Sequence, residues 1–171
     1  MTETYPEVVV PFEYTYNFPI NTVWAQLDDF GGWSKWYPAL VNMSLEGGDE
    51  NQIGAIRKFS SKASSFVYEE KLVEKDVHNY TLKYLVLAKT FLSPYTKQHM
   101  NVLRLEKIDD SHTKLVLEAH ITPSTEIPQE VIEKFKTFTA GGQTAMYDSL
   151  ATYLQSQQYT QPEKVLKEIS V

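Results

Sequence analysis

Apolar and polar residues alternate along much of the chain up to residue 122, which is the period of a β-strand. Pro11 interrupts one face of the segment 7–16, which indicates an edge strand or a bend, and the opposite face carries Val8, Val10, Phe12, Tyr14 and Tyr16. Short turns rich in Gly, Asp, Asn and Ser separate further strand-like segments at 41–46, 53–61, 66–74, 80–88, 97–107 and 113–122. Connections this short join antiparallel neighbours, so we expect a seven-stranded antiparallel sheet.

Two regions have the period of a helix instead. After the first strand, Val23, Trp24, Leu27 and Phe30 recur at helical spacing, with Asn21 as a candidate N-cap. Gly31-Gly32 ends this helix, and we expect a second short helical turn before Pro38.

A long helix is predicted from Pro128 to about residue 156, roughly 43 Å at 1.5 Å per residue. Its apolar face is traced by Val131, Phe135, Phe138, Ala145, Met146, Leu150 and Tyr153. Gly141-Gly142 interrupts the pattern, and two interpretations are open. The glycines mark a kink or close packing on the sheet, or they leave room for a ligand beneath the helix.

The order of the elements predicts one α+β domain over residues 1–156, followed by a polar tail over 157–171 that Pro162 breaks. A curved sheet with one face to cover needs the single long helix to lie across that face. The two surfaces cannot close perfectly against each other, so we expect a space between them, with its mouth near the two short helices.

This order resembles the helix-grip fold of the polyketide cyclase/dehydrase and START-type lipid-binding (SRPBCC) superfamily over about residues 8–155. The motifs that carry the resemblance are VWAQLDDFGGWSKWYP (23–38), IGAIRKF (53–59), YEEKLVEKD (68–76), YTLKYLV (80–86), TKLVLEAHI (113–121) and MYDSLATYL (146–154). The loop EGGDENQIG is shorter than in the plant pollen allergens, so the chain is most similar to the bacterial-style polyketide cyclase branch. Leu117 departs from the pattern, since many members carry a tryptophan there.

The resemblance implies a curved seven-stranded sheet wrapped around the long C-terminal helix, with a cavity for a lipid, sterol or polyketide-like compound. It implies no particular reaction, because the superfamily includes carriers, receptors, chaperone activators and cyclases. Function must therefore be argued from the residues that face the cavity.

Charge and composition exclude some classes of binding partner. The 171 residues carry a net charge of −6 without a run of Lys and Arg, so we expect neither nucleic acid nor an anionic membrane surface. No apolar run approaches the roughly 18 residues of a membrane span, and no signal peptide opens the chain. Cysteine is absent, which excludes disulfides and thiolate chemistry. We expect a cytoplasmic monomer or homodimer whose partner is a hydrophobic small molecule.

Motifs for cofactor chemistry are also missing. No histidine or carboxylate cluster has metal-ligand spacing, no G-x-S-x-G occurs, and the glycine-rich turn lacks the lysine of a phosphate loop. We therefore expect no metal and no cofactor.

Strand alternation assigns the polar residues that face the cavity. A hairpin turning at 109–111 pairs Leu103 with Leu117 and Asn101 with Ala119, which sorts apolar side chains to one face. His99 and Asn101 are the polar groups on that inner face, and the outer face holds Gln98, Arg104, Lys114, Glu118 and His120.

A second hairpin, turning near Ala63-Ser64, pairs Arg57 with Glu70 and Phe59 with Tyr68. Two interpretations of the charged pair are open. It is a structural ion pair, or it is a polar clamp that orients a carbonyl, carboxylate or hydroxyl of a ligand.

Three functions remain open from the sequence. The first is a carrier or sensor of a hydrophobic small molecule, with Trp36 and Tyr37 at the lip of the cavity. The second is a cofactor-free cyclase or dehydratase, with His99 or Glu70 as base and Arg57 or Tyr84 polarising a carbonyl. The third, weaker one is a protein-interaction module. The predicted ligand-binding set is Trp36, Tyr37, Arg57, Phe59, Tyr68, Glu70, Tyr84, His99, Asn101, Leu103, Leu117, Phe138, Gly142, Met146 and Tyr147.

Overall fold

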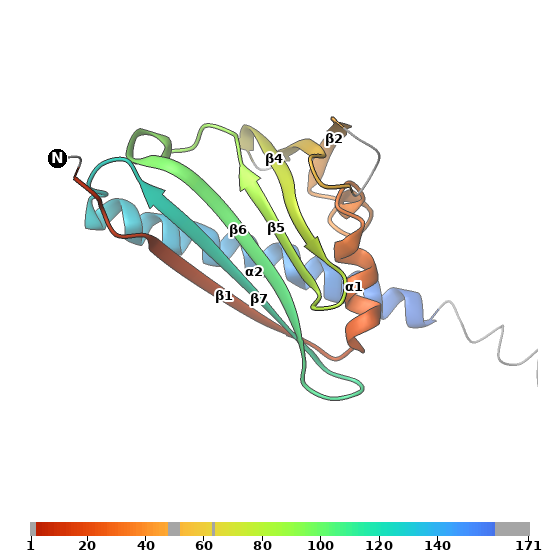
Figure 1. The fold of residues 1–171 in the computed structure, drawn as a ribbon. Coiled ribbons are helices and arrows are strands. Elements are labelled where there is room, and N and C mark those ends of the chain that lie inside the picture. The colour runs from red at the N-terminus through yellow and green to blue at the C-terminus, as the bar shows by residue number, and fades with distance from the viewer. Residues whose placement is uncertain (1–2, 48–51, 63, 160–171) are drawn as a thin grey trace, which may run out of the picture.

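The computed structural model describes residues 3–47, 52–62 and 64–159 and has the predicted order of elements (Figure 1). A strand comes first, two short helices follow, then six strands and one long helix. Their bounds are β1 (Val8–Tyr16), α1 (Ile20–Asp28), the 3-10 helix η1 (Trp33–Lys35), β2 (Leu40–Glu46), β3 (Ile56–Ser61), β4 (Ser64–Asp76), β5 (Thr81–Val86), the 3-10 helix η2 (Ser93–Tyr95), β6 (Thr96–Lys107), β7 (Thr113–Pro123) and α2 (Gln129–Tyr159).

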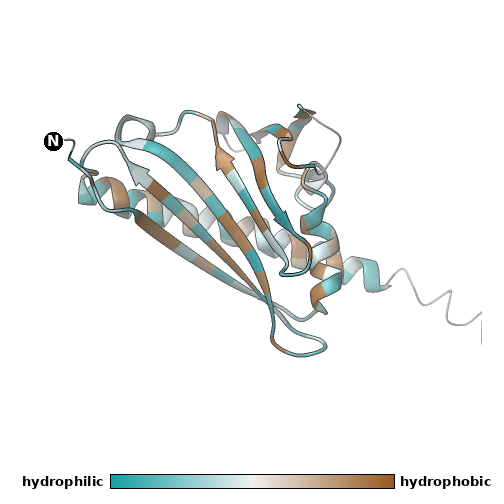
Figure 2. Ribbon diagram, viewed as in Figure 1, coloured by the Kyte–Doolittle hydropathy of each residue, from teal (hydrophilic) through white to brown (hydrophobic). Residues whose placement is uncertain are grey.

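The seven strands form one antiparallel sheet in the order β1-β7-β6-β5-β4-β3-β2. Both predicted hairpin registers are confirmed, because Leu103 pairs with Leu117 and Arg57 pairs with Glu70. The sheet curves, and α2 crosses it along its length, so the fold is the expected α+β helix grip (Figure 1). Bands of hydrophobic and hydrophilic residues alternate along the strands in Figure 2. We call the face toward α2 the inner face.

The start of α1 differs from the prediction. Pro19 takes the N-cap position, and its carbonyl oxygen accepts hydrogen bonds from the N–H groups of Thr22 and Val23. Asn21 as N-cap is wrong, because Asn21 lies inside the first turn. There its Oδ1 accepts a hydrogen bond from the hydroxyl of Tyr80 at 2.8 Å.

The helix α2 has 31 residues, or about 46 Å. It continues as regular helix through Gly141 and Gly142, and a Cβ atom at either glycine would meet no atom within 4 Å. Close packing of these glycines on the sheet is therefore wrong. The helix extends to Tyr159, and the rest of the predicted tail, 160–171, lies outside the described residues. No helix in the described ranges has the length and apolar character needed to cross a membrane.

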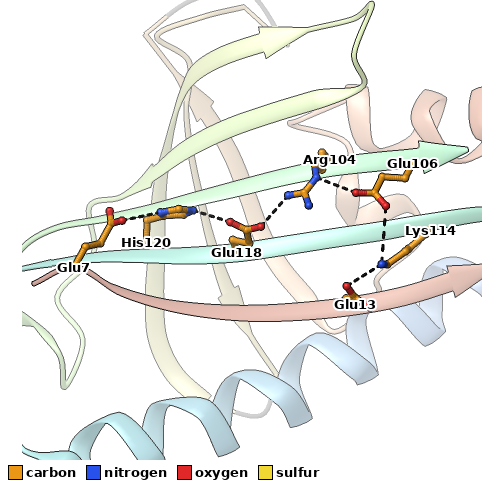
Figure 3. A network of polar contacts seen from close by, with 7 residues as sticks. All are labelled: Glu7, Glu13, Arg104, Glu106, Lys114, Glu118 and His120. Carbon is orange, nitrogen blue, oxygen red and sulfur yellow. Dashed lines mark hydrogen bonds and ion pairs between the residues drawn. The ribbon is translucent and has the colours of Figure 1, made fainter.

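The outer face of the sheet carries a chain of charged contacts, the outer row (Figure 3). His120 lies between two carboxylates, 3.3 Å from Glu7 and 3.0 Å from Glu118. Arg104 continues the row with an ion pair of 2.9 Å to Glu118. The complete outer row is Glu7, His120, Glu118, Arg104, Glu106, Lys114 and Glu13. These side chains are 26–59% exposed, and they keep this face in contact with solvent.

The inner face and the helices enclose two separate hydrophobic clusters. The larger joins α1, η1 and the C-terminal half of α2 to the sheet, with Trp33, Trp36, Tyr147 and Leu150 among its buried members. The smaller lies at the other end of α2, around Ile121, Ile127 and Phe135. The middle of α2 runs between the two clusters.

Candidate functional site

Five polar side chains cross the inner face, and we call them the polar stripe: Arg57 on β3, Glu70 on β4, Tyr84 on β5, and Asn101 and His99 on β6. Strand pairing makes them neighbours, because Arg57 pairs with Glu70 and Tyr84 pairs with Asn101. Buried leucines surround the stripe, namely Leu72, Leu82, Leu103 and Leu117. Every member was predicted from the sequence to face this side.

Arg57 and Glu70 form a buried ion pair at one end of the stripe. The Nε of Arg57 donates to Glu70 Oε2 over 2.7 Å, and Nη2 lies 2.6 Å from the same oxygen. The third nitrogen, Nη1, donates to the carbonyl oxygen of Phe30 at 2.9 Å. The two side chains are 2% and 10% exposed, so solvent screens the pair only weakly. All three nitrogens of Arg57 are thus engaged within the protein.

The same guanidinium holds the aromatic loop between α1 and η1. The Cζ atom of Arg57 lies 3.9 Å from the ring centre of Phe30 and 3.8 Å from that of Trp33. Both aromatic side chains are buried, and Trp33 Nε1 donates to the carbonyl of Leu27. A cation between two ring faces in a dry setting is a favourable arrangement. These contacts favour the structural interpretation of Arg57.

At the other end of the stripe, His99 is half-buried and hydrogen-bonded to Asn101. Its Nε2 lies 3.1 Å from Asn101 Oδ1. The ring packs edge-on against Phe135 of α2, with 5.6 Å between ring centres. Burial lowers the pKa of His99 to about 4, and the bond to Asn101 only partly opposes that shift. His99 is therefore uncharged at neutral pH.

The helix α2 presents Tyr147 to the sheet, and its hydroxyl has no hydrogen-bond partner among the described residues. Tyr147 is fully buried, with its ring packed against Phe12 and Tyr14 of β1. Burial raises its pKa well above the usual value, and nearby Tyr84 raises it further. The pKa of the buried Tyr84 is also raised, again chiefly by burial. Both phenols are neutral.

Gln143 adds a second unpartnered group one turn before Tyr147. Its Oε1 is buried without a hydrogen-bond partner among the described residues. Residues four apart lie on the same face of a helix, so Gln143 and Tyr147 are neighbours. Sequence reasoning missed Gln143. The available signal was a polar residue four positions before Tyr147 and next to Gly142.

The predicted lip residues lie at different depths. Trp36 is 2% exposed and packs on Trp33, and its Nε1 has no partner among the described residues. Its carbonyl oxygen accepts a hydrogen bond from Ser149 of α2 at 2.6 Å. Tyr37 is half-buried. The rings of Phe59 on β3 and Tyr68 on β4 stack on each other. Burial and the proximity of Tyr68 raise the pKa of Tyr37.

The predicted α2 residues differ in exposure. Met146 is partly buried against the larger cluster, whereas Gly142 is exposed and Phe138 is 58% exposed. Phe138 packs edge-on against Phe91, with 6.2 Å between ring centres. The side of α2 that carries Gly142 is therefore uncovered in mid-helix.

Two hollows lie beside this part of the fold. One of about 210 Å³ opens between β1 and α2, lined by Val10, Pro11, Phe12, Lys136, Thr139 and Ala140. The other, of about 150 Å³, lies at the ends of β5 and β6 and reaches His99. No group of three or more His, Asp or Glu residues suited to a metal ion occurs in the part of the chain that the structure describes.

Comparison with family models covers most of the chain. The model described as polyketide cyclase / dehydrase and lipid transport matches residues 9–155. A comparison with curated protein sequences gave no significant match.

Solved structures share this fold at low sequence identity. A protein from Thermobifida fusca, solved by NMR, is 23% identical with a TM-score of 0.72, over 85% of this chain and 92% of that one. Norcoclaurine synthase from Thalictrum flavum, in complex with dopamine and hydroxybenzaldehyde, is 13% identical with a TM-score of 0.70, over 88% of each chain. Ara h 8.0201 is 16% identical with a TM-score of 0.67, over 88% of this chain and 99% of that one. Likeness at these identities concerns the fold alone.

Proposed function

The chain belongs to the polyketide cyclase / dehydrase and lipid transport family, and from this premise we propose that it binds a hydrophobic small molecule as a carrier or sensor. The ligand lies between the inner face of the sheet and the middle of α2. Leucines and aromatic side chains of the inner face supply the apolar contacts, and the polar stripe supplies a few orienting groups.

Gly142 is the observation that carries this proposal. It lies seven residues after Phe135 and four before Met146, so the three share one face of α2. Phe135 is buried and Met146 is partly buried, whereas Gly142 is exposed and a Cβ atom there would meet nothing within 4 Å. The side of α2 that carries Gly142 is therefore open to solvent between the two hydrophobic clusters. Such an opening suits an apolar guest.

The contacts of the stripe favour binding over catalysis. Arg57 and Glu70 neutralise each other, and Arg57 is also held by Phe30 and Trp33. A histidine with a pKa of about 4 is a weak base at neutral pH, so His99 gives little general-base catalysis there. A cyclase or dehydratase would have to use these same groups.

The proposal is tested by filling the open space. The hydrocarbon fluorophore diphenylhexatriene has no polar group, so its uptake reports apolar binding alone. In Gly142→Leu we expect its affinity to fall by about tenfold or more, because overpacking a filled site costs roughly 1–3 kcal/mol. The variant remains folded, since replacing a helical glycine favours the helix by up to about 1 kcal/mol.

Gly141→Leu is the matched control. Gly141 is the adjacent residue, so it points about 100° around the helix from Gly142, and a Cβ atom there also meets nothing within 4 Å. We expect the control to gain stability and to retain uptake. No uptake by the unmodified protein, or equal uptake by both variants, would overturn the proposal.

A further inference from the structure

We propose that the ligand carries an uncharged hydroxyl or carbonyl group, which binds to Tyr147 and Gln143 of α2 next to the polar stripe. This inference rests on the proposed function and adds the chemical class of the ligand. It predicts a neutral alcohol, phenol or ketone with an apolar body, and it excludes a free fatty acid.

The unpartnered atoms on α2 define the recognition chemistry. The Tyr147 hydroxyl can donate and accept, and the Gln143 amide can do both as well. Both Tyr147 Oη and Gln143 Oε1 are buried without a partner among the described residues, although almost all buried polar groups in proteins are hydrogen-bonded. A guest hydroxyl can satisfy both groups, because it can donate to Gln143 Oε1 and accept from the Tyr147 hydroxyl, whereas a guest carbonyl can only accept from Tyr147.

The charges around this site exclude an ionised head group. Arg57 and Glu70 are the only charged side chains buried in the part of the chain that the structure describes, and they are paired with each other. Tyr147 is close enough to Arg57 and Glu70 for their charges to act on its hydroxyl. A carboxylate bound there would add a second buried negative charge with no cation left to balance it.

Other cations do not supply that balance. His99 is neutral because burial holds its pKa at about 4. Lys136 lines the hollow beside β1, but its ammonium is paired with Glu133 at 3.2 Å. Neither side chain therefore offers a positive charge to a ligand. The remaining polar interaction is hydrogen bonding to a neutral group.

Three ligands with the same chain separate the possibilities: decane, decanol and decanoate. Each is titrated at pH 7.5 against protein loaded with diphenylhexatriene, and displacement is read by fluorescence. We expect decanol to bind at least about tenfold more tightly than decanoate, because a single unit of buried charge without a partner costs more than 1.4 kcal/mol. We expect decanol to bind roughly three- to tenfold more tightly than decane, because a hydrogen bond contributes about 0.5–1.5 kcal/mol.

Tyr147→Phe then removes the hydroxyl and keeps the ring, and we expect the ratio of decanol to decane affinity to fall toward one. Tyr14→Phe is the matched control, because the Tyr14 hydroxyl donates to Asp148 over 2.6 Å instead of facing the stripe. That control is expected to keep the ratio of the unmodified protein.

The outcomes distinguish this inference from the proposed function. Uptake of diphenylhexatriene with equal or tighter binding of decanoate overturns the inference and leaves the proposed function standing. An unchanged ratio in Tyr147→Phe also overturns it. Failure to take up diphenylhexatriene or any of the three chains overturns both.

Discussion

The two faces of the sheet each carry a series of polar side chains across neighbouring strands, and the two series differ in how they are satisfied. In the outer row, Arg104 and Lys114 contact carboxylates, His120 contacts Glu7 and Glu118, and the members are 26–59% exposed (Figure 3). In the polar stripe, Arg57 and Glu70 form one ion pair that is almost fully buried. Opposite the stripe, on α2, Tyr147 and Gln143 each have a buried polar atom without a hydrogen-bond partner among the described residues.

On the proposed function, this difference separates groups that stabilise the fold from groups that bind the ligand. Exposed ion pairs are screened by solvent, so each contact of the outer row contributes little to stability. Buried polar atoms without hydrogen-bond partners destabilise a folded protein.

The largest expected effect on stability comes from removing the ion pair of the polar stripe. Arg57→Ala leaves Glu70 buried without its cation and removes the contacts to Phe30 and Trp33. We expect the free energy of unfolding to fall by about 3–5 kcal/mol, measured by urea denaturation. Arg104→Ala in the outer row is the matched control, with an expected loss below about 1 kcal/mol. Similar losses in the two variants would contradict the distinction between the faces.

The second effect concerns pH and His99. Its pKa is about 4 in the folded protein and 6.5 in the reference state, so between these values the unfolded chain binds a proton that the folded chain does not. Stability contributed by the neutral ring is therefore present above pH 6.5 and is lost as the pH falls toward 4, by roughly 2–3 kcal/mol. In His99→Gln we expect urea denaturation at pH 7.5 and 4.5 to show a smaller difference than in the unmodified protein. Parallel pH curves for the two proteins would contradict the assignment.

The smallest effect compares two buried tyrosines that differ in hydrogen bonding. The Tyr16 hydroxyl donates to the carbonyl of Tyr147 at 3.2 Å, so Tyr16→Phe is expected to lower the free energy of unfolding by about 1 kcal/mol. Tyr147→Phe removes a hydroxyl that has no partner among the described residues, and it is expected to raise that free energy by about 1 kcal/mol in the ligand-free protein. Thermal unfolding measures both. A loss of stability in Tyr147→Phe would show that its hydroxyl is already bonded in the empty protein.

Much of the sheet could be predicted because the side chains of a strand can be assigned to its two faces in only two ways. A shift of one residue would have put Arg104 and Glu118 inside and Leu103 and Leu117 outside, so only one register was consistent. The same logic correctly placed Arg57 opposite Glu70. The predicted family and helix-grip fold are confirmed as well.

Contacts between elements far apart in the sequence were beyond prediction. Alternation put Arg57 on the inner face, but it did not reveal that Phe30 and Trp33 enclose its guanidinium. Helical spacing likewise put Phe138 on the apolar face, whereas it is 58% exposed because α2 lies between two clusters there. The capping error at Asn21 was local, since α1 begins two residues earlier than predicted and Pro19 takes the N-cap position.

The pairing of β1 with β7 also has a consequence for the order of synthesis. Partners such as Tyr16 and Thr113 are about 100 residues apart, so the first strand leaves the ribosome roughly 5–20 s before its partner exists. During that interval an alternating, apolar strand has both edges open to other chains. Pro11 removes one backbone donor from this strand, which makes it a poorer template for aggregation. A residue of an edge strand in the finished protein therefore also protects the nascent chain.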